Sequence, residues 1–353
     1  MRRGFAALLV GALLLSACSG DDTDTEPADT TAVPDTTSSP PTTVVVDPAS
    51  VPADPSAGCG SEATTPAGET ELAITSGDID GSYARYVPTA HDGDTPVPLV
   101  VDLHGLVEGG PIHASHTRLG PFGEQEGFVT ITPDAHREPA YWALDEGDVT
   151  FMTDLLDQVE GDLCVDRNRV YVTGLSMGGM MTTVLGCALA DRFAAAAPVA
   201  GVGAPPTCDR ERPVPVVIFH GTEDPIIDYG GGLGPGADDL PIPGEPGETL
   251  GEQSEDEAAA TEAFLVGAEA GAEVWAEGNG CPDAEPSVET VTDDVERHDY
   301  GCEVELYRVI GGGHTWPGSQ FDAAIGDIVG PVTMSIDANE VMWAFFQDHP
   351  LTD

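Results

Sequence analysis

The segment Gly174-Leu175-Ser176-Met177-Gly178 constrains the fold more than any other part of this chain. It follows a run of β-branched and apolar residues at 169–173 and precedes a segment with helical periodicity. A serine between a strand and a helix sits on a strained turn, and glycines two residues to either side leave room for the crossing backbones. The pattern therefore predicts a strand, a sharp turn and a helix, with Ser176 exposed at the end of the strand.

Short apolar runs alternate with helical segments from residue 59 onward. We expect strands at 83–87, 99–103, 129–132, 170–173, 195–199, 216–219 and 304–309. We expect helices at 149–159, 177–190, 257–270 and 338–347, where apolar residues recur at a spacing of three and four. This alternation is typical of an α/β fold with a mostly parallel central sheet and helices on both faces.

A serine hydroxyl is protonated near neutral pH, so a nucleophilic serine needs a base. His314 follows the predicted strand at 304–309 after three glycines, which permit a sharp loop over the end of the sheet. His298 lies in a charged loop and His349 follows the last predicted helix, so neither has this setting. His314 is therefore the predicted base.

A carboxylate must orient that base and stabilise its protonated form. Asp224 lies in the turn just beyond the predicted strand at 216–219, and we favour it over Glu223 and Asp228. His220 directly follows the same strand and is expected to make structural hydrogen bonds. The resulting order of serine, aspartate and histidine along the chain is that of the α/β hydrolases.

Acyl transfer also needs hydrogen-bond donors for the developing oxyanion. The backbone N–H of Met177, directly after the serine, is one predicted donor. A second is expected after the strand at 99–103, where His104 and Gly105 precede Leu106, and we predict the backbone N–H of Leu106. No metal or organic cofactor is required for this chemistry.

Two short motifs suggest metal binding and are interpreted otherwise. His113 and His116 lack a cysteine or acidic partner at matching spacing, so we expect them at the start of a helix that rims the cleft. Asp78 and Asp80 resemble the start of a calcium loop, but the further ligands of such a loop are missing. A hairpin turn is the prediction there.

The first residues have the plan of an export signal. Two arginines precede an apolar run at 5–15 and small residues, which predicts a signal peptide at 1–17. The segment 15–18 resembles a bacterial lipobox, so Cys18 is the predicted site of lipidation, and an ordinary secretory signal is the alternative. Residues 18–57 are rich in Asp, Thr, Pro and Ser and predict a disordered tether. The catalytic domain is then 58–353, held at the outer face of the membrane or in the cell envelope.

Charge and cysteine content agree with an exported domain. The formal net charge of −50 argues against nucleic acid as a partner. Besides Cys18 the chain has six cysteines, an even number that suits disulfides in an oxidising compartment. Cys281 and Cys302 flank one excursion of the chain and are the expected pair, whereas the pairing of the other four stays open. Residues 229–255, rich in Gly, Pro, Asp and Glu, predict a long surface loop that gates the cleft or has no catalytic role.

Several motifs together resemble a known family. They are the His-Gly at 104, GLSMGGMM at 174, HGTED at 220, NGC at 279 and GGGHTWPG at 311. Over 72–346 the chain is similar to the polyhydroxybutyrate depolymerase and feruloyl esterase-related family of secreted esterases with the α/β-hydrolase fold. The resemblance implies a triad of Ser176, Asp224 and His314. It also implies that Trp142, Trp316 and His104 lie near the acyl or aryl part of the substrate.

The chain departs from many of these relatives at two places. They carry one cysteine directly after the His-Gly and another beside the tryptophan, whereas this chain has Leu106 at the first place and Ala140-Tyr141 before Trp142. The predicted function is that of a serine esterase that acts through an acyl-enzyme at Ser176, on small or oligomeric esters of the hydroxyalkanoate or feruloyl and aryl type. A serine peptidase of the same fold and a catalytically inactive cell-surface binding protein are the alternatives.

Overall fold

The computed structural model describes residues 47–61, 66–135, 137–203, 208, 210, 212–245, 247–253, 264–283 and 285–352. Val46–Asp353 form one compact unit. The predicted signal peptide, Cys18, the tether up to residue 46 and positions 257–263 of one predicted helix lie outside the described residues. Among the helices of the described part, none is long and apolar enough to cross a membrane.

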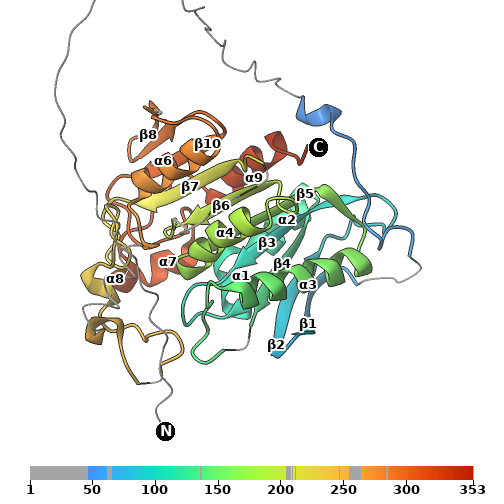
Figure 1. Cartoon of the computed structure of the whole chain (residues 1–353), viewed down its shortest axis with the longest axis horizontal. Coiled ribbons are helices and arrows are strands. Elements are labelled where there is room, and N and C mark those ends of the chain that lie inside the picture. Colours follow the sequence, from blue (N-terminus) through green and yellow to red (C-terminus); the bar gives the residue numbers. More distant parts are fainter. Residues whose placement is uncertain are drawn as a thin grey trace, which may run out of the picture. The chain divides into compact units, whose positions relative to one another are not determined.

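Within the described residues, a ten-stranded sheet has the order β1-β2-β4-β3-β5-β6-β7-β10-β9-β8 (Figure 1). Its centre is parallel and consists of β4 (Val129–Asp134), β3 (Val97–Leu103), β5 (Val165–Leu175), β6 (Ala195–Val199), β7 (Val216–Gly221) and β10 (Val304–Val309). Antiparallel strands extend both edges, namely β1 (Gly68–Ser76) and β2 (Ile79–Val87) on one side and β9 (Val295–Asp299) and β8 (Ser287–Thr292) on the other. The predicted mostly parallel sheet is confirmed.

All seven predicted strands are present, and β1, β8 and β9 were not predicted. The side chains of β8 are exposed apart from its last, half-buried residue, so the strand has no apolar pattern by which it could be found. β1 pairs with β2 as an antiparallel hairpin in which Ser76 lies opposite Ile79. The motif with Asp78 is therefore at a hairpin turn, as predicted.

The longer helices are α1 (Gly110–Thr117), α2 (Leu119–Glu126), α3 (Glu146–Asp162), α4 (Met177–Ala188), α6 (Ala268–Gly278) and α9 (Ala338–Asp348), and α7 (Gln320–Ala324) and α8 (Gly326–Val329) are short. Turns of 3-10 helix lie at Pro48–Ser50, Pro235–Ala237 and Leu250–Glu252. The predictions for α3, α4 and α9 are confirmed. The prediction at 257–270 is confirmed in part: residue 264 is helical, 265–267 interrupt the helix, and α6 begins at Ala268 and continues through Gly271. A Cβ on Gly271 would lie 2.7 Å from the Val202 side chain, so glycine there permits close packing and does not end the helix.

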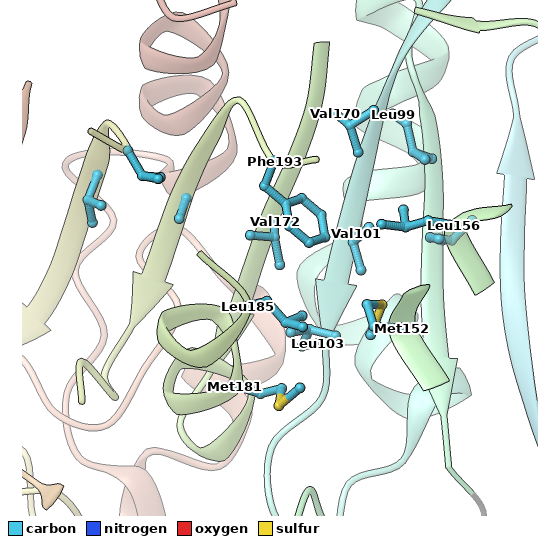
Figure 2. Close-up of a cluster of buried hydrophobic side chains, with 14 of the residues drawn as sticks. Leu99, Val101, Leu103, Met152, Leu156, Val170, Val172, Met181, Leu185 and Phe193 are labelled. Atoms are coloured by element: carbon cyan, nitrogen blue, oxygen red, sulfur yellow. The ribbon is translucent and has the colours of Figure 1, made fainter. Parts of the chain in front are cut away.

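Alternate residues of the central strands face two separate cores, one on each side of the sheet. Leu99, Val101 and Leu103 pack with residues of α3 and α4, as Figure 2 shows. Val100 faces the opposite core, to which α2 and α9 contribute. A strand that is buried on both faces has a continuous apolar sequence, which is why these strands were easy to predict.

The direction in which the chain progresses across the sheet reverses at β3. From β3 it passes through α1 and α2 to β4 on one side, and from β4 it returns through α3 to β5 on the other. Right-handed crossovers in opposite directions place their helices on opposite faces, which opens a crevice at the carboxyl ends of the two strands. The segment from His104 to Leu106 follows β3 and Ser176 follows β5, so both lie at this crevice.

Three disulfides tie the described parts together: Cys59–Cys164, Cys187–Cys208 and Cys281–Cys302. The last of these confirms the predicted pair. Such bonds are typical of a chain that folds in an oxidising compartment.

The end of the predicted tether lies on the domain. The Asp54 N–H donates to Asp166, the Ser56 hydroxyl donates to the Leu163 carbonyl, and Val51 is buried. These contacts use mostly backbone and polar groups, so composition does not indicate them.

The core around α3 gives a stability prediction. Phe151 is fully buried beside β2, and we expect Phe151→Ala to lower the free energy of unfolding by about 3–5 kcal/mol, because it removes buried surface and leaves a cavity. The exposed Val288→Ala serves as the control and is expected to change it by about 0.5 kcal/mol or less. Urea denaturation followed by circular dichroism measures both. A similar loss in the two variants would contradict this account of the core.

Candidate active site

Ser176 lies on a strained turn between β5 and α4. Its backbone has φ 59° and ψ −121°, and its N–H donates to the Val199 carbonyl at 2.9 Å. A Cβ on Gly178 would lie 1.9 Å from the Leu103 oxygen, and one on Gly201 would lie 2.1 Å from the Ser176 oxygen. Glycine is therefore required at position 178, after the turn, and at position 201, which packs against the turn. These close contacts hold Ser176 in a conformation that L residues seldom adopt.

Asp224 and His314 form a buried hydrogen-bonded pair. His314 Nδ1 lies 2.8 Å from Asp224 Oδ2, and the other carboxylate oxygen accepts the N–H groups of Ile226 and Ile227 at 2.8 and 2.9 Å. Both side chains are almost completely buried. His220 Nε2 lies 3.3 Å from the same carboxylate and 3.0 Å from the Ile227 carbonyl, which is the structural role predicted for it.

The surroundings of Asp224 favour its ionised form. Burial alone would raise the pKa of Asp224, but the neighbouring His314 and His220 outweigh that effect and hold it below its usual range. A carboxylate bonded to Nδ1 fixes the ring tautomer in which Nδ1 carries the proton. Nε2 of His314 is then the nitrogen that can accept a proton.

The three predicted triad residues follow strands of one parallel sheet. Ser176 follows β5, Asp224 follows β7 and His314 follows β10, and β10 pairs directly with β7. Only β6 separates β5 from β7, which corresponds to about 10 Å at the usual strand spacing. A Cβ on Gly221 would lie 2.2 Å from the Gly312 oxygen, so the glycine loop before His314 packs directly on the end of β7.

The two predicted oxyanion donors lie beside the serine. Met177 is the first residue of α4, and the N–H groups of a first helical turn have no partner within their helix. Leu106 follows β3 across the crevice, and a Cβ on the adjacent Gly105 would lie 3.6 Å from the Ser176 Cβ. Leu106, Met177 and Ser176 line one pocket.

This pocket has a volume of about 330 Å³ and a largely apolar wall. Beyond Leu106, Ser176 and Met177, the wall consists of Leu144, Met180, Ile226, Ile227, Leu233, Leu240, Pro243, Leu250, Gln253, Phe264 and Leu265. Five of these belong to the acidic loop 229–255, whose function the sequence left open. Asp238, Glu245 and Glu248 of that loop are exposed, so the loop presents apolar side chains to the pocket and carboxylates to solvent.

Trp142, Trp316 and His104 were predicted to contact substrate, and the structure places none of them in the pocket wall. Trp142 is 1% exposed and its Nε1 donates to the His104 carbonyl at 3.0 Å. Trp316 is 1% exposed and its Nε1 donates to Asn339. The His104 ring is fully buried against Trp142. These side chains pack beneath the surface and contact the backbone and side chains of the active-site loops. They resemble binding residues in the sequence because they lie close to His314 and Gly105.

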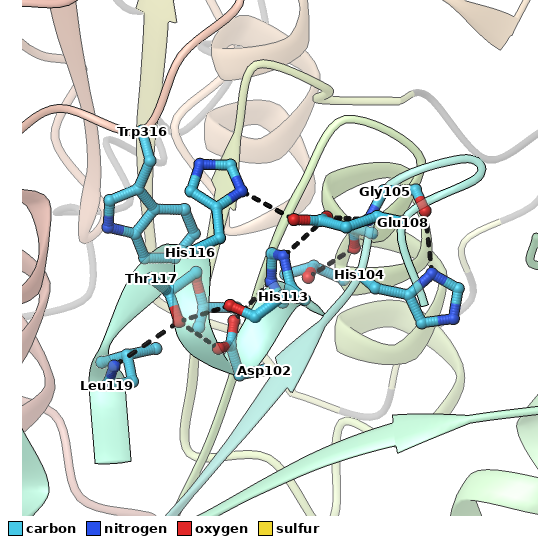
Figure 3. Close-up of polar contacts among 12 residues, drawn as sticks. Asp102, His104, Gly105, Glu108, His113, His116, Thr117, Leu119 and Trp316 are labelled. Carbon is cyan, nitrogen blue, oxygen red and sulfur yellow. Dashed lines mark hydrogen bonds and ion pairs between the residues drawn. The ribbon is translucent and has the colours of Figure 1, made fainter. Parts of the chain in front are cut away.

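A second polar cluster lies next to the crevice (Figure 3). Glu108 Oε2 lies 2.8 Å from His113 Nδ1, and Oε1 lies 2.7 Å from His116 Nδ1. Both histidines lie on a helix, as predicted, but His116 is near the end of α1 and not at its start, and the expectation that they lack an acidic partner is wrong. Glu108 stands five residues before His113 across the turn into α1, a spacing that differs from common metal motifs. The side-chain nitrogen and oxygen atoms of Glu108, His113 and His116 that could bind a metal ion lie within 4.8 Å of one another. The contacts of Glu108 with the two rings have the length of hydrogen bonds, so ring protons account for them.

A serine on a strand-to-helix turn, with an aspartate and a histidine after later strands of the same parallel sheet, defines the α/β hydrolases as the class to which this fold and site correspond. One solved structure, an acetyl xylan esterase from Aspergillus awamori, aligns with a TM-score of 0.51 over 72% of this chain and 97% of its own, at 18% identity. The α/β-hydrolase fold is thereby confirmed.

Sequence comparison identifies relatives more specifically. The chain is 29% identical over 242 residues to feruloyl esterase B of Piromyces equi, which covers 64% of this chain and 41% of the relative. It is 31% identical over 191 residues to a probable feruloyl esterase C of Aspergillus niger, covering 50% of this chain and 65% of the relative. A bifunctional acetylxylan esterase/xylanase of Neocallimastix patriciarum is 32% identical over 37% of this chain and 20% of its own length.

The chain thus spans less than two thirds of the length of each of these relatives. No protein-family model matches it. The chain is similar to feruloyl esterases and has the α/β-hydrolase fold, and the resemblance to feruloyl esterases stated from its motifs is confirmed. The resemblance to polyhydroxybutyrate depolymerases stays a prediction.

The buried pair gives a prediction for stability as a function of pH. Because the pKa of Asp224 is lowered on folding, its contribution to stability is present above its ordinary value of 3.8 and is lost as the pH falls below that value. Asp224→Asn keeps the shape but loses charge-assisted hydrogen bonds, so we expect it to be less stable than wild type by about 1–3 kcal/mol at pH 7. The difference should shrink in acid. Thermal denaturation between pH 3 and pH 8 measures it, and a difference that does not vary with pH would contradict the ionised pair.

Proposed function

We propose that this chain is a serine carboxylic ester hydrolase with Ser176 as nucleophile, His314 as general base and Asp224 as the residue that orients the base. The observation that carries the proposal is the strained Ser176 turn, which lines an apolar pocket and lies at the same sheet edge as the Asp224–His314 hydrogen bond of 2.8 Å. A strained turn, a buried carboxylate and a pocket at one place are the parts that acyl transfer requires.

In the proposed reaction His314 Nε2 takes the proton of the Ser176 hydroxyl as its oxygen attacks the ester carbonyl. The backbone N–H groups of Leu106 and Met177 donate to the oxyanion that forms. The tetrahedral intermediate collapses, the carbon–oxygen bond to the alcohol breaks, and His314 returns its proton to the leaving alcohol. Water, activated in turn by His314, then releases the acid from Ser176.

The pocket supports esters with an apolar acyl or aryl group. Its volume of about 330 Å³ suits a compact group such as a substituted phenylpropenoate or a short alkyl chain. The relatives named feruloyl esterase and acetylxylan esterase are consistent with an ester of this kind. We favour small or oligomeric esters over insoluble polymer.

The proposed location is outside the cytoplasm, with Cys18 lipidated. The three disulfides support an oxidising compartment. The apolar run at 5–15 that ends in small residues before Cys18 supports export and anchoring.

The nucleophile is tested with a fluorophosphonate probe, which reacts with activated serines. We expect wild type to be labelled and to hydrolyse p-nitrophenyl esters, and Ser176→Ala to lose labelling and at least about 10⁴-fold in kcat. The exposed Val288→Ala should behave as wild type. Equal labelling of wild type and Ser176→Ala would refute the assignment, cleavage of peptides without esters would point to a peptidase, and a folded but unlabelled wild type would indicate an inactive binding protein.

The pocket is tested by filling it. Leu240→Trp places a bulky side chain in the wall, so we expect kcat/KM for p-nitrophenyl hexanoate to fall about 10- to 100-fold, because each methylene excluded from an apolar site loses about 0.8 kcal/mol. Hydrolysis of the acetate ester should change less than about threefold. Val288→Trp, on the exposed face of β8, is the matched control. Equal losses for both esters would place the acyl group elsewhere.

A further inference from the structure

The proposed oxyanion loop is held by Glu108. Glu108 Oε2 accepts the N–H of Gly105 at 3.0 Å, and Gly105 directly precedes Leu106. The same carboxylate bridges two histidines of α1, His113 and His116, with one oxygen each. The position of the Leu106 N–H is therefore coupled to the geometry of Glu108.

The loop that carries His314 is held by Asp322. Asp322 Oδ2 accepts the N–H of Trp316 at 2.6 Å, two residues beyond His314. Its other oxygen lies 3.0 Å from His116 Nε2. His116 thus lies between two carboxylates, one for each of the two active-site loops.

Both rings of this cluster have a carboxylate at each nitrogen. His113 Nε2 lies 2.8 Å from Asp102 Oδ1, and the Asp102 carboxylate also accepts the Thr117 hydroxyl at 2.6 Å (Figure 3). A neutral imidazole donates from one nitrogen only, whereas an imidazolium donates from both. Two imidazolium rings donate hydrogen bonds to Asp102 and Glu108 in three of these contacts, and the fourth, between His116 Nε2 and Asp322, is an ion pair at 3.0 Å without hydrogen-bond geometry.

We propose that His116 is a positioning residue for the ester hydrolysis proposed above: as an imidazolium it joins the oxyanion loop, through Glu108, to the His314 loop, through Asp322. His116 is 5% exposed and lies at the end of α1, with Phe321 of α7 packed on its ring. His116 therefore acts through Glu108 and Asp322, and it fixes the position of Leu106 relative to His314 across the crevice.

The titration of the bridge sets a pH window. The charged groups that face His116 are Glu108 from the loop after β3, Asp322 from α7 and His113 from α1. Burial lowers the pKa of His116, but the two carboxylates raise it further, from 6.5 to about 9. The charged bridge is therefore fully present below pH 6.5 and is lost as the pH rises through about 9. The pKa of His113 is raised in the same way. Burial lowers it, but Asp102 and Glu108 outweigh burial and raise it to about 10.

The test compares the full-length wild type, His116→Gln and the control His349→Gln, which alters a histidine at the end of α9. We expect kcat of wild type to fall above about pH 9 while circular dichroism still shows a folded protein. His116→Gln should lose about 10- to 100-fold in kcat at pH 7 with KM changed less than about threefold, and its alkaline decrease should be absent. Asp322→Asn should move that decrease to lower pH. A residue with only a structural role would lower activity without moving the pH profile.

A second measurement does not depend on catalysis. In ¹⁵N-histidine NMR the ring signal that disappears in His116→Gln should belong to an imidazolium at pH 7.5 and titrate near pH 9. A ring that titrates near 6.5 in an active esterase would overturn the bridge, and so would an alkaline decrease unchanged in His116→Gln. One tightly held transition-metal ion per wild-type chain, lost in His116→Gln, would also overturn it in favour of a metal site. A ring that titrates near pH 9 in a chain that hydrolyses no ester would instead contradict the proposed function.

Discussion

The close approach of α4 to β3 and β6 is the contact on which the site depends. The Leu103 oxygen occupies the space that a side chain at position 178 would need, and the Ser176 oxygen does the same for position 201. With glycine at these places the chain turns within one residue from β5 into α4, and Ser176 is held with a positive φ. Any larger residue would push the helix away from the sheet, and the serine, the Met177 N–H and the pocket mouth would move together.

Burial of charge decides how the remaining groups are held. Asp224 and the cluster around Glu108 lie where an isolated carboxylate would be costly, and in both places histidines and backbone N–H groups compensate for the lost water. Such groups have little freedom to move, since each shift would leave a buried charge without a partner. The two loops that face each other across the crevice are thus fixed by electrostatics, whereas the sheet beneath them is fixed by apolar packing.

The elements that can be predicted from the sequence are those whose local residue pattern is compatible with only one structure. Strands buried on both faces are continuous apolar runs, and the elbow around Ser176 and the order Ser176, Asp224, His314 are visible without tertiary contacts. Glu108 lies in the turn between β3 and α1, and its contacts with two histidines depend on the shape of that turn. Asp322 lies about 200 residues from His116 in the sequence, so no local pattern indicates that these two residues meet. Trp142 and Trp316 show the converse error, because a tryptophan next to a catalytic loop has the same sequence signature whether it supports the loop or binds substrate.

The loop 229–255 is acidic and rich in glycine and proline, yet it forms part of the apolar wall of the pocket. Leu233, Leu240 and Leu250 are too widely spaced to show helical or strand periodicity, yet 3-10 turns and bridges between short segments bring them together beside Met180. The carboxylates between them face water, so the composition reports only the outer surface. Because five of the wall residues come from this loop and not from the sheet, that part of the wall can change its shape without moving Ser176, Asp224 or His314. In the proposed enzyme, substrate preference is therefore separable from the chemistry.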